Sequence, residues 1–127
     1  MTTFTAIHSK NAPEVIGCYS QAVNIGNLVF LSGQIALDPV TQQLITDNIE
    51  AEIAQVFRNL QAVAEAAGAS LAKIVKLTIY LKDLKHFSLI NDAMKIFFTV
   101  PYPARAVVEV AGLPRGALVE IEGIIAP

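Results

Sequence analysis

The feature that most constrains this chain is a set of short strand-like segments that are apolar on both faces. Residues 28–31 and 106–108 carry apolar side chains at odd and even positions alike. Strands of this kind are normally covered from both sides, and the chain supplies only two helices, enough for one face of a sheet. We therefore expect other copies of the chain to bury the second face, because a bare apolar sheet would aggregate.

Two amphipathic helices are predicted from apolar residues that recur every three or four positions. The first spans residues 47–67, and its apolar stripe comprises Ile49, Ile53, Val56, Leu60, Val63 and Ala67. Asp47 suits the start of this helix and Gly68 its end. The second spans residues 85–98, and Pro101 prevents it from continuing far.

The remaining periodic segments predict six strands, over residues 4–8, 22–25, 28–34, 74–82, 105–111 and 117–125. Gly26 and Asn27 give a two-residue hairpin signal between the second and the third. In the fourth, the apolar side chains from Val75 to Leu81 are expected to share one face, and the last two strands are expected to pair as a hairpin. The order β-β-β-α-β-α-β-β indicates an α+β fold, a mixed β-sheet with two helices packed on one face.

Length and composition restrict the class of protein. The 127 residues predict a single domain over residues 1–127, and hydrophobic residues at 54% with charged residues at 16% exclude intrinsic disorder. The formal net charge of −2 argues against a nucleic-acid partner. The N-terminus lacks a signal-peptide pattern, and the uncharged residues 15–37 are too polar for a membrane span, so we expect a cytoplasmic protein without a membrane partner.

Cysteine and histidine usage excludes two further classes. Cys18 is the only cysteine, so no disulfide scaffold is expected, and no histidine lies near it in sequence to activate it as a nucleophile. His8 and His86 lack the spacing of metal ligands, so no metal site is expected.

Two charged residues suit a site for a small anion. Arg105 follows a proline-rich turn, where a guanidinium can bind a carboxylate through two parallel hydrogen bonds. Glu120 shares a strand face with Glu122, and a carboxylate in a partly dry cleft can act as a general base. The alternatives are an ordinary ion pair for Arg105 and a solvated face for the glutamates. Whether Arg105 and Glu120 share a face depends on the register of the last hairpin.

Four further residues are candidates for the lining of such a site. Tyr19 follows a flexible glycine and can cover a pocket, while Ser32 and Gly33 end a strand and can offer a hydroxyl and backbone groups to a ligand. Asn91 lies beside the apolar stripe of the second helix. Each residue also has an explanation without function. Tyr19 can belong to a turn, Ser32 and Gly33 to an irregular strand end, and Asn91 to a polar boundary position on its helix.

Taken together, six segments resemble the Rid family, also called the YjgF-type family, of reactive-intermediate or imine deaminases. They are Gly-Cys-Tyr-Ser-Gln-Ala-Val (17–23), Val-Phe-Leu-Ser-Gly-Gln-Ile (29–35), Ile-Val-Lys-Leu-Thr-Ile-Tyr-Leu-Lys-Asp (74–83), Pro-Ala-Arg (103–105), Val-Glu-Val-Ala-Gly-Leu-Pro (108–114) and Val-Glu-Ile-Glu (119–122). The resemblance covers essentially the whole chain. Because it has both Arg105 and Glu120, the chain resembles the RidA subfamily in particular.

The resemblance implies a chorismate-mutase-like fold and a homotrimer whose sheets form an inner barrel, with three clefts between subunits. It implies hydrolysis of 2-imino acids, such as 2-iminobutanoate and 2-iminopropanoate, or of their enamine tautomers, to 2-keto acids and ammonia without a cofactor. Pyridoxal-phosphate enzymes release such imines and would be protected from damage. Arg105 would hold the substrate carboxylate, Glu120 would activate water, and the cleft would be lined by Tyr19, Ser32, Gly33, Asn91 and Val107. The resemblance also favours Arg105 and Glu120 on one face.

The chain departs from the family pattern at several places. Cys18 stands where proline is usual, Val107 where cysteine is frequent, and Gly112 where a basic residue is common. The segment between Asn91 and Pro103 is shorter by about three residues, close to one helical turn. The competing hypotheses are a non-catalytic carboxylate sensor or interaction module on the same trimer, and a translation-inhibitor or ribonuclease-like activity, which the charge pattern does not support.

Overall fold

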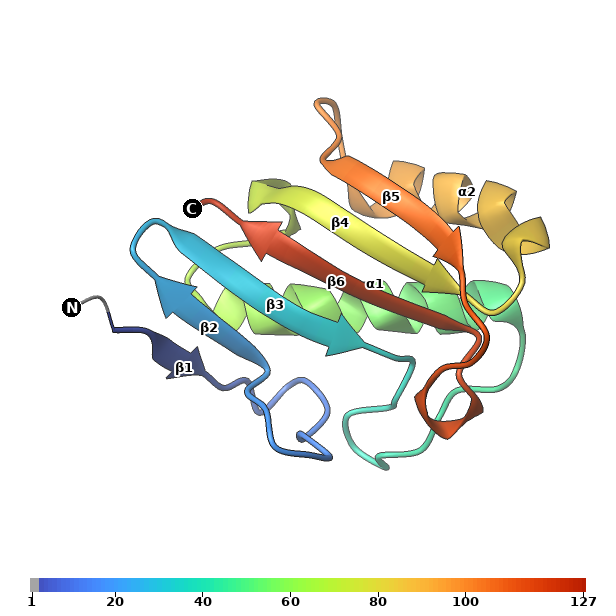
Figure 1. The fold of residues 1–127 in the computed structure, drawn as a ribbon, viewed down its shortest axis with the longest axis horizontal. Coiled ribbons are helices and arrows are strands. Elements are labelled where there is room, and N and C mark those ends of the chain that lie inside the picture. Colours follow the sequence, from blue (N-terminus) through green and yellow to red (C-terminus); the bar gives the residue numbers. More distant parts are fainter. Residues whose placement is uncertain (1–2) are drawn as a thin grey trace.

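The computed structural model describes residues 3–127, which form a six-stranded mixed sheet with two helices on one face (Figure 1). The strands are β1 (Thr5–Ile7), β2 (Ala22–Ile25), β3 (Leu28–Gln34), β4 (Ile74–Leu81), β5 (Ala104–Glu109) and β6 (Val119–Ile125). The helices are α1 (Ile49–Ala66) and α2 (Phe87–Phe97), and the strands lie in the order β1-β2-β3-β6-β4-β5. The predicted α+β fold and its order of elements are confirmed.

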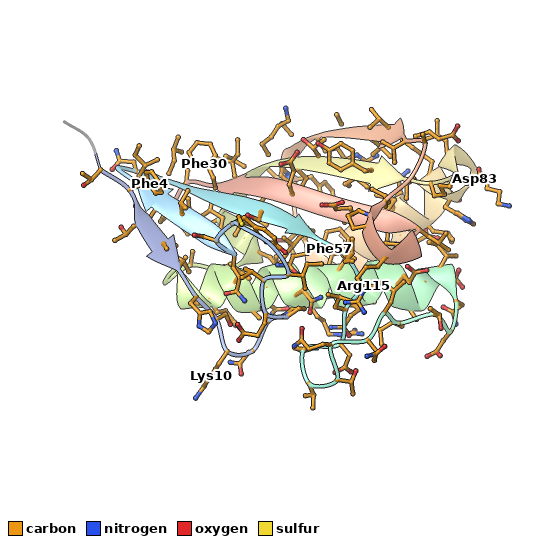
Figure 2. All side chains as sticks on the ribbon, turned by 60° about the horizontal axis from the view of Figure 1, so that its bottom comes forward. Phe4, Lys10, Phe30, Phe57, Asp83 and Arg115 are labelled. Carbon is orange, nitrogen blue, oxygen red and sulfur yellow. The ribbon has the colours of Figure 1, made fainter. Side chains whose placement is uncertain are left out.

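The main core lies between the helices and the sheet. Phe57 of α1 is fully buried in it, and Figure 2 shows this side chain between α1 and the strands. The ring of Phe57 stacks on Phe97 with 5.2 Å between centroids, and it meets Phe98 edge-on at 5.6 Å. These aromatic contacts join α2 to α1, so both helices pack on the same side of the sheet.

Helix α1 begins at Ile49, and its capping residue lies one position later than the sequence pattern suggests. Asn48, rather than Asp47, is the capping residue, and its side chain accepts a hydrogen bond from the backbone N–H of Ala51 at 2.7 Å. Both residue types are good caps, which is why the pattern alone does not separate the two positions. After the helix, Gly68 takes a φ of 78°, the left-handed conformation that favours glycine.

Strand β4 departs from the predicted alternation at its start. Its pairing with β6 shifts in register between Ile74 and Lys76. Ile74 is therefore buried, and Val75 is 47% exposed. The expectation that Val75 shares a face with Leu81 is wrong, because a bulge changes the side to which a residue points and alternation alone does not reveal it.

The last two strands do not form a hairpin, and that prediction is wrong. β4 lies between them, parallel to β5 and antiparallel to β6. A parallel pair needs a long crossover connection, which α2 supplies between β4 and β5. The connection from β5 to β6 then passes the end of β4, where Val110 N–H donates to Leu81 O at 2.9 Å and Lys82 N–H to Leu118 O at 3.0 Å.

The face of the sheet opposite the helices is uncovered in a single chain. Figure 2 shows Phe30 on this side, away from α1. Leu28, Phe30 and Val108 are between 37% and 42% exposed. They belong to the segments that are apolar on both faces. Among residues 3–127, no helix or strand covers this side of the sheet. In the same part of the chain, no helix has the length and apolar character needed to cross a membrane.

Candidate functional site

Glu120 and Glu122 lie on the uncovered face of β6, where both are half-buried. Val119 and Ile121 between them are fully buried toward the helices, so the two glutamates share a face, as predicted. β6 is a central strand between β3 and β4. Glu120 therefore has a neighbour on each side, and Tyr80 is its register partner on β4.

On the other side, Glu120 lies directly against the backbone of Gly33. The pairing of β3 with β6 shifts in register between Leu31 and Gln34, which brackets this glycine. A Cβ atom at position 33 would lie 3.0 Å from Cδ and 3.1 Å from Cγ of Glu120, and closer still to a carboxylate oxygen. Only glycine leaves room for the carboxyl group in this place.

A pocket of about 370 Å³ surrounds the Glu120 side chain. Its walls are formed by Ile16, Tyr19, Ser32, Gly33, Ile35, Pro114, Glu120 and Glu122. The Tyr19 hydroxyl accepts a hydrogen bond from Ile16 N–H at 3.3 Å. The Ser32 hydroxyl donates to Ser20 O at 2.6 Å, so its lone pairs can accept from a ligand. The structure thus brings four of the predicted site residues together: Tyr19, Ser32, Gly33 and Glu120.

The electrostatics of this pocket suit acid–base chemistry. Burial raises the pKa of the Glu120 carboxyl group above its ordinary value, and the negative charge of Glu122 raises it further. A carboxyl group with a raised pKa can take up a proton from water and deliver it to a leaving group near neutral pH. A partly dry cleft of this kind is the environment expected for a general base.

Arg105 lies on the opposite face of the sheet, so the expectation that it shares a face with Glu120 is wrong. Its register partner on β4 is Leu77, which is fully buried beneath the helices. Glu120 instead pairs with Tyr80, three residues further along β4 and therefore on the other face. The Arg105 guanidinium stands 5.3 Å from the centre of the Phe87 ring of α2.

A second pocket, of about 270 Å³, lies at Arg105 on the helix side. Its walls are formed by Asn91, Met94, Lys95, Tyr102, Pro103 and Arg105. Asn91 therefore accompanies Arg105 despite the short segment before Pro103. Val107 lies on the same face of β5 as Arg105 but packs against the main core and is absent from the walls of this pocket. A fixed guanidinium in a pocket is suited to bind a carboxylate.

Sequence reasoning did not single out Tyr80, Phe87 or Lys95. The Tyr80 hydroxyl donates to the carboxylate of Glu122, and its place on the polar side of an alternating strand was the available signal. Phe87 and Lys95 are each four residues from Asn91 on α2, and this spacing places all three along one side of the helix. That periodicity could have pointed to them.

The remaining reactive side chains lie outside both pockets. Cys18 is exposed, and the His8 ring approaches the Glu14 carboxylate at 3.2 Å. Within residues 3–127, no three histidine, cysteine, aspartate or glutamate residues lie close enough together to hold a metal ion.

Comparison with known proteins places the chain in a family. Residues 9–126 match the family described as Endoribonuclease L-PSP. The chain is 49% identical to the 2-iminobutanoate/2-iminopropanoate deaminase of Dermatophagoides farinae over 119 residues, 94% of this chain and 93% of that protein.

Two solved structures share the fold over nearly their full length. RidA from the Antarctic bacterium Psychrobacter sp. PAMC 21119 is 45% identical, with a TM-score of 0.94 over 97% of this chain and 99% of that one. E. coli TdcF with bound serine is 36% identical, with a TM-score of 0.91 over 97% of this chain and 98% of that one. The chain therefore belongs to the endoribonuclease L-PSP family, which is the Rid or YjgF-type family that its six segments resemble.

Proposed function

We propose that this protein hydrolyses 2-imino acids and their enamine tautomers, such as 2-iminobutanoate and 2-iminopropanoate, to 2-keto acids and ammonia. The observation that carries the proposal is the half-buried Glu120, seated against Gly33 in a pocket on the uncovered face. The identity of 49% to an imine deaminase supports it. Removal of such imines would protect the pyridoxal-phosphate enzymes that release them.

The proposed site is completed by a second copy of the chain. Arg105 and Glu120 lie on opposite faces of one sheet, so a single copy does not bring both to a small substrate. The uncovered apolar face that carries Glu120 is a surface that another copy would bury. We propose a homotrimer with the uncovered faces turned inward, in which Arg105 of one copy approaches Glu120 of the next.

The chemistry follows from these two groups. The guanidinium of Arg105 binds the substrate carboxylate through parallel hydrogen bonds and fixes the imine carbon beside Glu120. Glu120 takes a proton from a water molecule as its oxygen adds to that carbon, and the imine nitrogen is protonated. In the resulting carbinolamine, Glu120 takes the proton of the new hydroxyl group and passes a proton to the nitrogen, so that the C–N bond breaks, ammonia leaves and the C=O bond of the 2-keto acid forms. The two protons that the nitrogen gains both come from the added water by way of Glu120, and the reaction requires no cofactor.

The other predicted residues have supporting roles in this proposal. Ser32 and Gly33 shape the floor beside Glu120, and Tyr19 covers one side of the pocket. Asn91 lies in the wall beside Arg105 and can donate to or accept from the substrate. Val107, on the same face of β5 as Arg105, supports it through the core instead of lining the pocket.

The test is an assay in which a dehydratase generates the imine and its disappearance is followed with and without this protein. Glu120→Gln is expected to abolish the acceleration and retain binding of a 2-keto acid, whereas Arg105→Ala is expected to lose both. Full acceleration by Arg105→Ala would refute the carboxylate-binding role. Binding of a 2-keto acid by a wild-type protein that does not turn over imines would support the sensor hypothesis instead.

A further inference from the structure

Tyr80 and Glu122 form a hydrogen-bonded pair beside Glu120 that the proposed reaction does not use. The Tyr80 hydroxyl donates to Oε1 of Glu122. In the register of β4 and β6, Tyr80 stands opposite Glu120, and Thr78 stands opposite Glu122. The bond is therefore diagonal, and a side chain from the position facing Glu120 holds the next carboxylate along the same strand face.

Glu122 belongs to the same hollow surface as Glu120. Two pockets on this face, of about 370 and 360 Å³, both include Gly33, Pro114 and the two glutamates in their walls, and the second adds Tyr80. Side chains two positions apart on a strand are separated by roughly 6 to 7 Å. The charge of Glu122 therefore lies closer to Glu120 than the screening length at physiological salt, so salt weakens their interaction only in part.

Within one chain, the titratable groups that face Glu120 come from its own strand and two other segments, and in the proposed trimer the Arg105 guanidinium of a second copy joins them in the wild type and in the variants alike. Glu122 lies on β6, Tyr80 lies on β4, and Tyr19 lies in the segment before β2. β3 presents only a serine and a glycine to this pocket, so it adds no charge. Glu122 is thus the one carboxylate that shares these two pockets with Glu120.

Basic residues near this surface are engaged elsewhere or flank it. Lys82 donates from its ammonium group to Ala111 O at 2.8 Å, and Lys76 lines a separate hollow that Glu122 also borders. Neither Glu120 nor Glu122 forms an ion pair among the described residues. The Tyr80 phenol is therefore the group that holds Glu122 in place, and this hydrogen bond raises the pKa of the phenol.

We propose that Glu122, anchored by Tyr80, is a positioning residue for the reaction and acts on Glu120 through its negative charge. The inference rests on the proposed function, because Glu120 is the acid–base group of that reaction. A neighbouring negative charge favours the protonated form of Glu120. Glu120 therefore keeps the proton taken from water until the leaving nitrogen accepts it, and Tyr80 fixes the second carboxylate at a constant separation.

The first test is the pH profile of kcat/KM for Glu122→Gln, which keeps the shape of the side chain and removes its charge. The charge of Glu122 raises the pKa of Glu120, so its loss is expected to move the acid limb of the profile to lower pH. At pH values well below the midpoint of the acid limb, kcat/KM is expressed as a fraction of its maximum for each protein. This fraction is expected to be roughly two- to threefold higher for the variant than for the wild type. A profile that overlays the wild type would overturn the proposal.

Tyr80→Phe tests the anchoring role. It keeps the ring and removes the hydroxyl, so Glu122 is free to turn toward solvent, and the acid limb is expected to move in the same direction by a smaller amount. In the Glu122→Gln background, Tyr80→Phe is expected to add nothing. An equal additional shift in that background would show that Tyr80 does not act through Glu122. The matched control is Glu65→Gln on the exposed side of α1, which removes one negative charge elsewhere and is expected to leave the profile unchanged.

A second measurement separates this inference from the proposed function. The Glu120 carboxyl group can be titrated directly by ¹³C NMR in the wild type and in Glu122→Gln, with no substrate present. Titration at lower pH in the variant supports the electrostatic action on Glu120, and an identical titration overturns it. Absence of imine turnover by the wild type would instead refute the deaminase proposal and leave this titration as the readout for the pair.

Discussion

The separation of Arg105 from Glu120 allows a complementation experiment. Arg105→Ala and Glu120→Gln are each expected to be inactive as pure proteins, because each lacks one half of every site. If a site combines Arg105 of one copy with Glu120 of another, an assembly of both variants contains some sites with two intact halves. The mixture is then expected to regain activity that neither parent shows.

The magnitude follows from the arrangement of the two faces. In a random assembly from equal amounts of the two variants, a site is intact under one condition. The copy that supplies Arg105 must be the Glu120→Gln variant, and the copy that supplies Glu120 must be the Arg105→Ala variant. The chance is about one half for each, so about one quarter of the sites are expected to be active in any cyclic assembly. If mixed assemblies are isolated through two different affinity tags, a trimer is expected to have about one third of its sites intact.

The assay is imine turnover by the co-expressed, doubly purified protein, with the two parents and a tagged wild type as references. Activity of one third of the wild type would support both the shared site and the trimer. A mixed assembly that remains as inactive as its parents would show that Arg105 and Glu120 act within one chain. The proposal that each site combines residues of two copies would then be wrong.

Three further perturbations test other parts of the structure. Gly33→Ala is expected to lower kcat/KM about tenfold or more, because the added Cβ displaces the Glu120 carboxyl group, while the urea midpoint changes little. Asn59→Ala is expected to lower the free energy of unfolding by about 2 to 3 kcal/mol, because the buried amide donates to two backbone carbonyls at 2.9 and 3.2 Å, and urea unfolding at fixed protein concentration measures this. Burial raises the pKa of Glu52, so the folded state holds a proton there more tightly and stability is lost as pH rises above the ordinary glutamate range. Glu52→Gln is therefore expected to gain stability over the wild type as the pH rises above the ordinary glutamate range, which urea unfolding at a series of pH values measures, and a pH-independent difference would contradict this reasoning.

Local structure was largely predictable from this sequence. The helical stripes place α1 and α2 within a few residues of their observed ends, because helix ends depend on capping residues and glycine that the sequence shows directly. The alternation around Glu120 also places both glutamates on one face, since neighbours such as Val119 are strongly apolar. These features depend on contacts between residues that are close in the chain.

Strand pairing was less predictable, because it depends on residues far apart in the chain. The segments that contain Arg105 and Glu120 are consecutive in sequence, yet β4 inserts between them and pairs with both. The bulge that exposes Val75 and the tight contact at Gly33 have the same origin, since each arises against a partner strand. The candidate residues were therefore identified one by one, while their division into two pockets required the structure.

The same periodicity that forms the core also makes the proposed site depend on the proposed assembly. β6 gives Val119 and Ile121 to the core, and side chains alternate along a strand, so Glu120 must point to the opposite, uncovered face. A slip of one residue would place the carboxylate in the core, so the register is fixed by burial and not by the site itself. On that face, Glu120 remains partly open to water until another surface covers it. Arg105 faces the helix side of its own sheet, so in the proposed trimer a second copy would both cover Glu120 and bring the missing cation, and burial of the apolar face and completion of the site would be one event.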